Sequence, residues 1–228
     1  MLFMPFDPLF LMLVMPALLF SMWAQFKVKS SFGKYSKERT QKGLTGAAAA
    51  EEVLRQAGIT DVRIEKVPGH LTDHYDPSSN VIRLSESVHD STSVAAVGVA
   101  AHEAGHAIQY ADAYAPIKVR AAIIPVTNFG SKLAVPMIMI GVIIGMTGLI
   151  NIGILLFGAV VVFQLVTLPV EFNASRRAID VLDGTLMLTE TEVYGAKKVL
   201  SAAALTYVGA LAVSLAHLLY FILLSKRR

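Results

Sequence analysis

The feature that most restricts the fold of this chain is a long stretch without a single charged residue, from Leu133 to Pro169. A helix that crosses the hydrocarbon core of a bilayer needs about 20 residues, so this stretch is long enough for two crossings. The sequence Gly148–Gly153 lies near its middle and predicts the turn between them. Since a chain that crosses twice returns to the side it left, the residues before and after this hairpin are expected to share one side of a membrane.

Two further apolar stretches, Leu9–Trp23 and Ala202–Leu224, predict one membrane helix each. The first is followed by positive charges and not by a small-residue cleavage site, which argues against a signal peptide. Hydrophobic residues make up 54% of the chain and charged residues 16%, a balance too apolar for a soluble globule of 228 residues. The chain is therefore predicted to be a multi-pass membrane protein with four crossings.

The basic residues predict its orientation. Six of them follow the first apolar stretch: Lys27, Lys29, Lys34, Lys37, Arg39 and Lys42. Positive residues close to a membrane helix favour the cytoplasm, so this segment is expected to be a solvated linker at the inner surface of a bacterial cell membrane. Residues 226–228 are also basic and would lie outside after a fourth crossing, against this tendency. Because the basic residues cluster beside apolar segments, the net charge of +3 predicts no nucleic-acid partner.

A water-facing domain of mixed α and β structure is predicted between the first crossing and the hairpin. The expected elements are a helix over Ala47–Arg55 capped by Thr45 and stopped at Gly58, strands over Asp61–Val67 and Asn80–Ser85, and a helix over Ser91–Ala111 capped by Asp90 or Ser91. The polar stretch His70–Pro77 lies between the two strands. It is interpreted either as a loop or as a wall of a substrate cleft, with a second metal site as a further possibility.

The second of these helices carries His102-Glu103-Ala104-Gly105-His106, an H-E-x-x-H motif. Residues four apart lie on one helix face, so both imidazoles can bind the same metal ion. One Zn²⁺ per chain is expected, because imidazole nitrogen suits this ion. Glu103 is placed to take a proton from a water molecule that attacks a carbonyl. Gly98 and Gly105 lack side chains, which would allow a neighbouring helix or a substrate to approach closely.

A catalytic zinc site needs a third protein ligand, and the chain has no cysteine to supply it. The candidates are Glu171, His70, Asp73, His74, Asp76, His89 and His217. Glu171 is favoured because the hairpin returns it to the side of the motif, at the start of a helix that leaves the membrane. Candidates for binding substrate or stabilising an oxyanion are His74, Tyr207, Arg176 and Arg177.

The chain resembles the YugP-like bacterial membrane zinc metallopeptidases. The similar sequences are L-T-D-H-Y-D-P at 71–77, A-A-H-E-A-G-H-A at 100–107, V-E-F-N-A-S-R-R-A at 170–178 and G-A-K-K-V-L-S-A-A-A-L-T-Y-V at 195–208. The resemblance implies a gluzincin with His102, His106 and Glu171 as zinc ligands and Glu103 as catalytic acid and base. The more distant HtpX heat-shock proteases and CAAX prenyl endopeptidases carry an acid four positions after the third ligand, where this chain has Ser175. Asp180 or a residue of 70–76 is expected to take over the role of that acid.

The predicted fold class is membrane α+β, with about four transmembrane helices and a small zincin-like catalytic domain on the membrane face. The predicted parts are residues 1–26, the first transmembrane helix; 27–120, the water-facing metallopeptidase part; 121–170, the transmembrane hairpin; 171–200, a helix with the third ligand and a connection; and 201–228, the fourth transmembrane helix.

The expected activity is zinc-dependent hydrolysis of peptide bonds in membrane-associated or misfolded proteins, at the cytoplasmic face of the membrane. A strand such as Asn80–Ser85 could hold an extended substrate. A metal-binding or transport protein is an alternative, but it would need ligands in the membrane, and Leu133–Pro169 contains neither charge nor histidine. A catalytically inactive zincin-like scaffold is another alternative, and it would not require an intact Glu103. The sequence indicates no oligomeric state.

Overall fold

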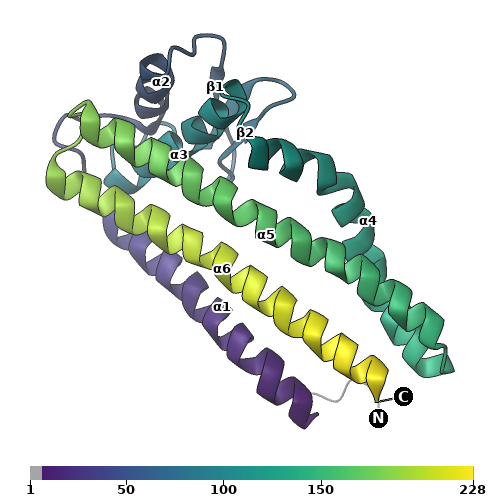
Figure 1. The fold of residues 1–228 in the computed structure, drawn as a ribbon. Helices are drawn as coiled ribbons and strands as arrows, with labels where there is room; N and C mark the ends of the chain where they lie inside the picture. The colour runs from purple at the N-terminus through teal and green to yellow at the C-terminus, as the bar shows by residue number, and fades with distance from the viewer. Residues whose placement is uncertain (1–6, 228) are drawn as a thin grey trace. The chain divides into compact units, whose positions relative to one another are not determined.

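The computed structural model describes residues 7–227 and is drawn in Figure 1. Its elements are, in order, α1 (Pro8–Tyr35), α2 (Gly46–Gln56), β1 (Arg63–Val67), β2 (His74–Asp76), β3 (Val81–Ser85), α3 (Val94–Ala111), α4 (Ala115–Ile144), α5 (Thr147–Gly184) and α6 (Glu190–Lys226). Four of these helices, α1, α4, α5 and α6, are long and apolar enough to cross a membrane. The predicted class, membrane α+β, is confirmed.

The chain divides into two compact units, each built from separate segments of sequence. The first, called here the membrane unit, contains residues 1–25, 118–168 and 205–228. The second, called the catalytic unit after the activity predicted from its sequence, contains residues 26–117 and 169–204. All four long helices, α1, α4, α5 and α6, contribute residues to both units, so the boundaries fall inside helices and not in linkers.

In the membrane unit, the turn between α4 and α5 lies earlier than predicted. The helix α4 ends at Ile144, and Gly145 takes a left-handed conformation with φ 74° that few other residues adopt without strain. The predicted turn at Gly148–Gly153 is wrong, because these residues lie inside α5. Gly153 serves packing instead: a Cβ atom there would lie 2.8 Å from the carbonyl oxygen of Ala134 on α4.

The catalytic unit contains a three-stranded sheet in the order β1-β3-β2, with β1 parallel and β2 antiparallel to β3. Apolar residues from several elements, among them Val53, Ile82, Val97 and Leu200, form its buried core. The helix α2 begins after Thr45, whose side chain accepts a hydrogen bond from the Ala48 N–H, as predicted.

The helix α3 begins three residues later than predicted. Its N-cap is Ser93, whose backbone is extended and whose hydroxyl accepts a hydrogen bond from the Ala96 N–H. The predicted caps Asp90 and Ser91 are wrong, since the Ser91 hydroxyl donates instead to the Ser93 Oγ. The shift leaves the motif well inside the helix, where its spacing is regular.

Two long helices extend further than predicted. The helix α1 continues to Tyr35, so the basic residues from Lys27 to Lys34 are helical and not a linker. The helix α5 is drawn as one continuous helix in Figure 1 and includes Pro169, so Glu171 does not begin a helix but lies within one. An interior proline removes one helix hydrogen bond and its ring crowds the carbonyl four residues earlier, and membrane helices tolerate both effects.

Candidate metal centre and active site

The helix α3 approaches α5 closely at the motif. A Cβ atom on Gly105 would lie 2.5 Å from the carbonyl oxygen of Ala174, so only glycine allows this separation of the two backbones. Glu171 lies three residues, or nearly one turn, before Ala174 on α5. The close approach predicted from the glycine is therefore present, and it brings the Glu171 carboxylate to the two motif histidines.

His102, His106 and Glu171 offer one ligand atom each, and these atoms all lie within 4.8 Å of one another. The Glu171 Oε2 is 3.3 Å from the His102 Nε2 and 3.6 Å from the His106 Nε2. Tetrahedral zinc with bonds of about 2.0–2.1 Å separates its ligand atoms by about 3.3–3.4 Å. Two imidazoles and one carboxylate are also a common catalytic zinc set, so the residues fit one zinc ion.

The other ring nitrogen of each histidine has a polar neighbour. The His102 Nδ1 is 3.1 Å from the Ser175 Oγ, and the His106 Nδ1 is 3.0 Å from the Gln109 Oε1. A contact at Nδ1 that accepts a proton leaves the Nε2 lone pair available for a metal. The prediction that Asp180 or a residue of 70–76 contacts a zinc histidine is wrong, because Ser175 itself lies at His102.

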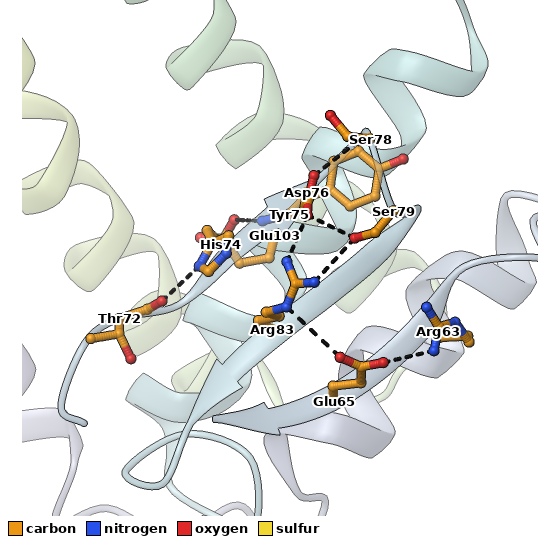
Figure 2. Close-up of polar contacts among 10 residues, drawn as sticks. All are labelled: Arg63, Glu65, Thr72, His74, Tyr75, Asp76, Ser78, Ser79, Arg83 and Glu103. Atoms are coloured by element: carbon orange, nitrogen blue, oxygen red, sulfur yellow. Dashed lines mark hydrogen bonds and ion pairs between the residues drawn. The ribbon is translucent and has the colours of Figure 1, made fainter. Parts of the chain in front are cut away.

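Glu103 is buried beside the strand β2. Its Oε2 accepts a hydrogen bond of 3.1 Å from the backbone N–H of Tyr75, as Figure 2 shows. Glu103 is only 8% exposed, so little water can reach its carboxylate. The bond from the Tyr75 N–H therefore supplies a hydrogen bond that water would otherwise provide. The tyrosine that makes it was not singled out from the sequence, because a backbone donor has no residue signature.

Charged side chains attach β2 to the sheet. Arg83 on the central strand β3 donates to the Asp76 Oδ2 at 2.7 Å and lies 3.8 Å from Glu65 on β1 (Figure 2). Bonds from Arg83, Ser79 and the Ser78 N–H lower the pKa of Asp76 well below its usual value. The Asp76 carboxylate is therefore charged at neutral pH. Arg83 connects all three strands, because it pairs with Asp76 on β2 and with Glu65 on β1.

Burial of His106 acts to lower the pKa of its imidazole. The hydrogen bond to Glu171 and the negative charges of Glu103 and Glu171 outweigh burial, so the pKa of His106 lies above its usual value. The negative charges of Glu103 and Glu171 that favour a proton on His106 also suit the site to a divalent cation.

Residues 10–226 match a protein family described as "Putative neutral zinc metallopeptidase". The chain belongs to this family. It is 50% identical over 216 residues to the "Putative membrane protease YugP" of Bacillus subtilis (strain 168), covering 95% of this chain and 96% of that protein. No solved structure matches the chain. The resemblance to YugP-like zinc metallopeptidases is confirmed, and with it the expectation of one zinc ion and of a membrane protein.

Within residues 7–227, the metal cluster contains none of the other candidate ligands. In the catalytic unit, each of these candidates contacts another residue. The rings of His70 and His74 contact the Phe32 ring and the Thr72 carbonyl, respectively. Asp73 accepts hydrogen bonds from the Ser85 N–H and hydroxyl, Asp76 pairs with Arg83, and His89 pairs with Asp90. His217 belongs to the membrane unit, where its ring lies among Phe10, Phe157 and Phe221.

The candidates for oxyanion stabilisation are distributed differently. Arg177 donates to Asn173 and Asp112, and these bonds occupy its guanidinium. Arg176 is exposed and lines a cavity of about 260 Å³ together with Ser175, Asp180 and Lys197. Tyr207 belongs to the membrane unit. His74 is the first residue of β2 and directly precedes Tyr75, whose N–H binds Glu103. Of the four candidates, His74 is therefore the one that lies on the strand next to Glu103.

Proposed function

We propose that this zinc metallopeptidase is an endopeptidase that cleaves membrane-associated or misfolded proteins at the cytoplasmic face of the membrane. The observation that carries the proposal is the convergence of His102, His106 and Glu171 on one small volume, with Glu103 one residue from the first ligand. The chain also has four helices long and apolar enough to cross a membrane, which favours substrates that are themselves near the membrane.

The chain's own residues divide the chemistry as follows. His102, His106 and Glu171 hold zinc, which when bound acts as a Lewis acid on the scissile carbonyl and makes water a stronger acid. Glu103 takes the proton of the attacking water and delivers it to the leaving amine. The Tyr75 N–H orients the Glu103 carboxylate, so that it needs little rearrangement when the proton moves.

The substrate would bind beside β2. The strand β3, predicted over Asn80–Ser85 as a holder of substrate, pairs with β1 on one side and β2 on the other. It therefore has no open edge over its central residues. Glu103 accepts the Tyr75 N–H of β2, so a substrate bound beside this strand would pass the catalytic carboxylate, while the Tyr75 N–H would remain bonded to Glu103.

The test separates metal binding from catalysis. Purified wild-type protein should contain about one zinc per chain and should cleave peptide bonds in a detergent-solubilised substrate. Glu103→Gln should keep the zinc and lose the cleavage, because the amide cannot accept the proton. His102→Ala should lose both.

The natural substrates can be sought by comparing membrane proteomes of cells that carry the wild-type chain or Glu103→Gln. Proteins that accumulate intact only with Glu103→Gln are the expected substrates. A protein that binds no transition metal after zinc is supplied, or a Glu103→Gln variant with full cleavage, would overturn the proposal.

A further inference from the structure

A buried glutamine lies on the motif helix outside the motif itself. Gln109 is 0% exposed and is among the largest fully buried side chains of the described residues. It lies three residues after His106, on the same face of α3. Burying an amide is costly unless all its polar atoms have partners, so the partners of Gln109 indicate what it is for.

The two hydrogens of the Gln109 amide are both used on α5. Its Nε2 donates to the Val170 carbonyl oxygen at 2.7 Å and to the Asn173 Oδ1 at 3.0 Å. A backbone carbonyl can only accept, so the amide cannot be turned around without losing this bond. The Asn173 atom is also defined as an acceptor, because the Arg177 Nε, which can only donate, binds it at 2.8 Å.

These bonds leave one role for the remaining oxygen. The Gln109 Oε1 faces the His106 Nδ1 at 3.0 Å and can only accept. The proton of the neutral imidazole must then be on Nδ1, and the lone pair must be on Nε2, the nitrogen nearest Glu171. Ser175 at His102 differs, since a hydroxyl can donate or accept and imposes no such choice.

The series of hydrogen bonds that begins at His106 extends through Arg177 to the exposed side chain of Asp112. Arg177 also donates to Asp112, the C-cap residue of α3, and its guanidinium lies 6.0 Å from the ring centre of Tyr114. The direction of every bond from Arg177 to His106 is therefore determined by groups that have a single possible role. An ion pair at the edge of the catalytic unit thus fixes the amide next to a zinc ligand.

We propose that Gln109 is a positioning residue that holds His106 in the tautomer able to bind zinc, and that Arg177 and Asn173 fix the orientation of Gln109. This inference rests on the proposed zinc site. A carboxylate at position 109 would also accept the bond, but an amide does so without adding a negative charge. The ligand set then keeps a single carboxylate, Glu171.

The first experiment measures zinc affinity by competition with a chelator, together with the melting temperature of the zinc-free protein. Gln109→Met has nearly the same shape but no acceptor, so its zinc affinity should fall about 10–100-fold, as is common when an outer partner of a metal ligand is lost. Gln109→Glu keeps an acceptor at His106 but loses both donated bonds to α5, so it should bind zinc more weakly than wild type and more tightly than Gln109→Met. A residue that only packs α3 against α5 would give the opposite order, because methionine preserves packing better than a buried charge.

The second experiment tests the outer part of the chain of bonds. Arg177→Met should weaken zinc binding several-fold, because Gln109 then loses part of its orientation. Arg176→Met is the matched control, since Arg176 is exposed and makes none of these bonds, and its zinc affinity should be unchanged. Wild-type zinc affinity in Gln109→Met, or equal losses in Gln109→Met and Gln109→Glu, would overturn the inference. A wild-type protein without zinc would instead overturn the proposed function.

Discussion

At the scale of single residues, the charge of the ligand set separates the candidate sites. Two neutral imidazoles and one carboxylate leave a net charge of +1 with zinc, whereas three histidines would leave +2. A lower charge suits hydrolysis in which a glutamate takes the proton of water, as in other sites with two histidines and one glutamate. Glu171 is 3% exposed and lies against both motif histidines, which accounts for a carboxylate buried so deeply.

Glu171→Ala should therefore lose zinc about as severely as His106→Ala, since each removes one of three ligands. His70→Ala and His74→Ala are the controls and should keep the metal, because in the catalytic unit these rings bind Phe32 and the Thr72 carbonyl. Elemental analysis of the purified variants measures the effect. Full zinc occupancy in Glu171→Ala combined with loss in His74→Ala would show that the polar stretch supplies the third ligand.

At the scale of elements, the site depends on the separation of α3 and α5. His102 and His106 come from one helix and Glu171 from the other, so a small increase in this separation moves the carboxylate away from both imidazoles. Gly105 is the point of closest approach, with the Ala174 backbone where a side chain would be. The second glycine of α3, Gly98, faces Ala196 on α6 with a larger clearance of 3.3 Å for a Cβ atom.

Gly105→Ala should lower the free energy of unfolding by about 1–3 kcal/mol, because overpacking against a backbone cannot be relieved by a rotamer change. It should also weaken zinc binding. Gly158→Ala is the control: no heavy atom lies within 4 Å of a Cβ there, and alanine favours helix more than glycine does. Thermal unfolding in detergent and chelator competition measure the two effects. A Gly105→Ala protein as stable as Gly158→Ala would contradict the close packing of α3 and α5.

At the scale of the whole molecule, the catalytic unit is assembled from segments on either side of the α4–α5 hairpin. Residues 26–117 supply the motif, and residues 169–204 supply the third ligand. Between them the chain passes through two helices that are each long and apolar enough to cross a bilayer. An even number of crossings is therefore required for the site to exist.

The absence of cysteine makes this topology simple to test by labelling single introduced cysteines with a membrane-impermeant reagent. Lys37→Cys and Arg176→Cys should be labelled from the same side of the membrane, which we predict to be the cytoplasm. Met146→Cys, in the exposed connection between α4 and α5, should be labelled from the opposite side. Opposite accessibility of positions 37 and 176 would remove Glu171 from the site.

Much of this protein follows from local sequence. Apolar stretches of membrane length predicted four long helices, and the four-residue spacing of His102 and His106 predicted a shared helix face. Thr45 was also predicted correctly as an N-cap, because its side chain bonds the N–H of Ala48, only three residues away. Such features depend on helix geometry and hydrophobicity, which neighbouring residues determine without help from the rest of the chain.

Other features were decided only when distant segments packed together. Gly153, which predicted part of a turn, lies instead inside α5 because its backbone packs against Ala134 of α4. The partners of the zinc ligands, Ser175 and Gln109, and the Tyr75 N–H at Glu103, come from bonds across 73, 3 and 28 positions of sequence. Only the bond between Gln109 and His106 is local. The orientation of the Gln109 amide is determined by Val170 and Asn173, which are 61 and 64 positions away. Buried polar groups take whichever partners the tertiary structure brings within reach, so the sequence alone determines which groups need partners, and the fold determines which ones they find.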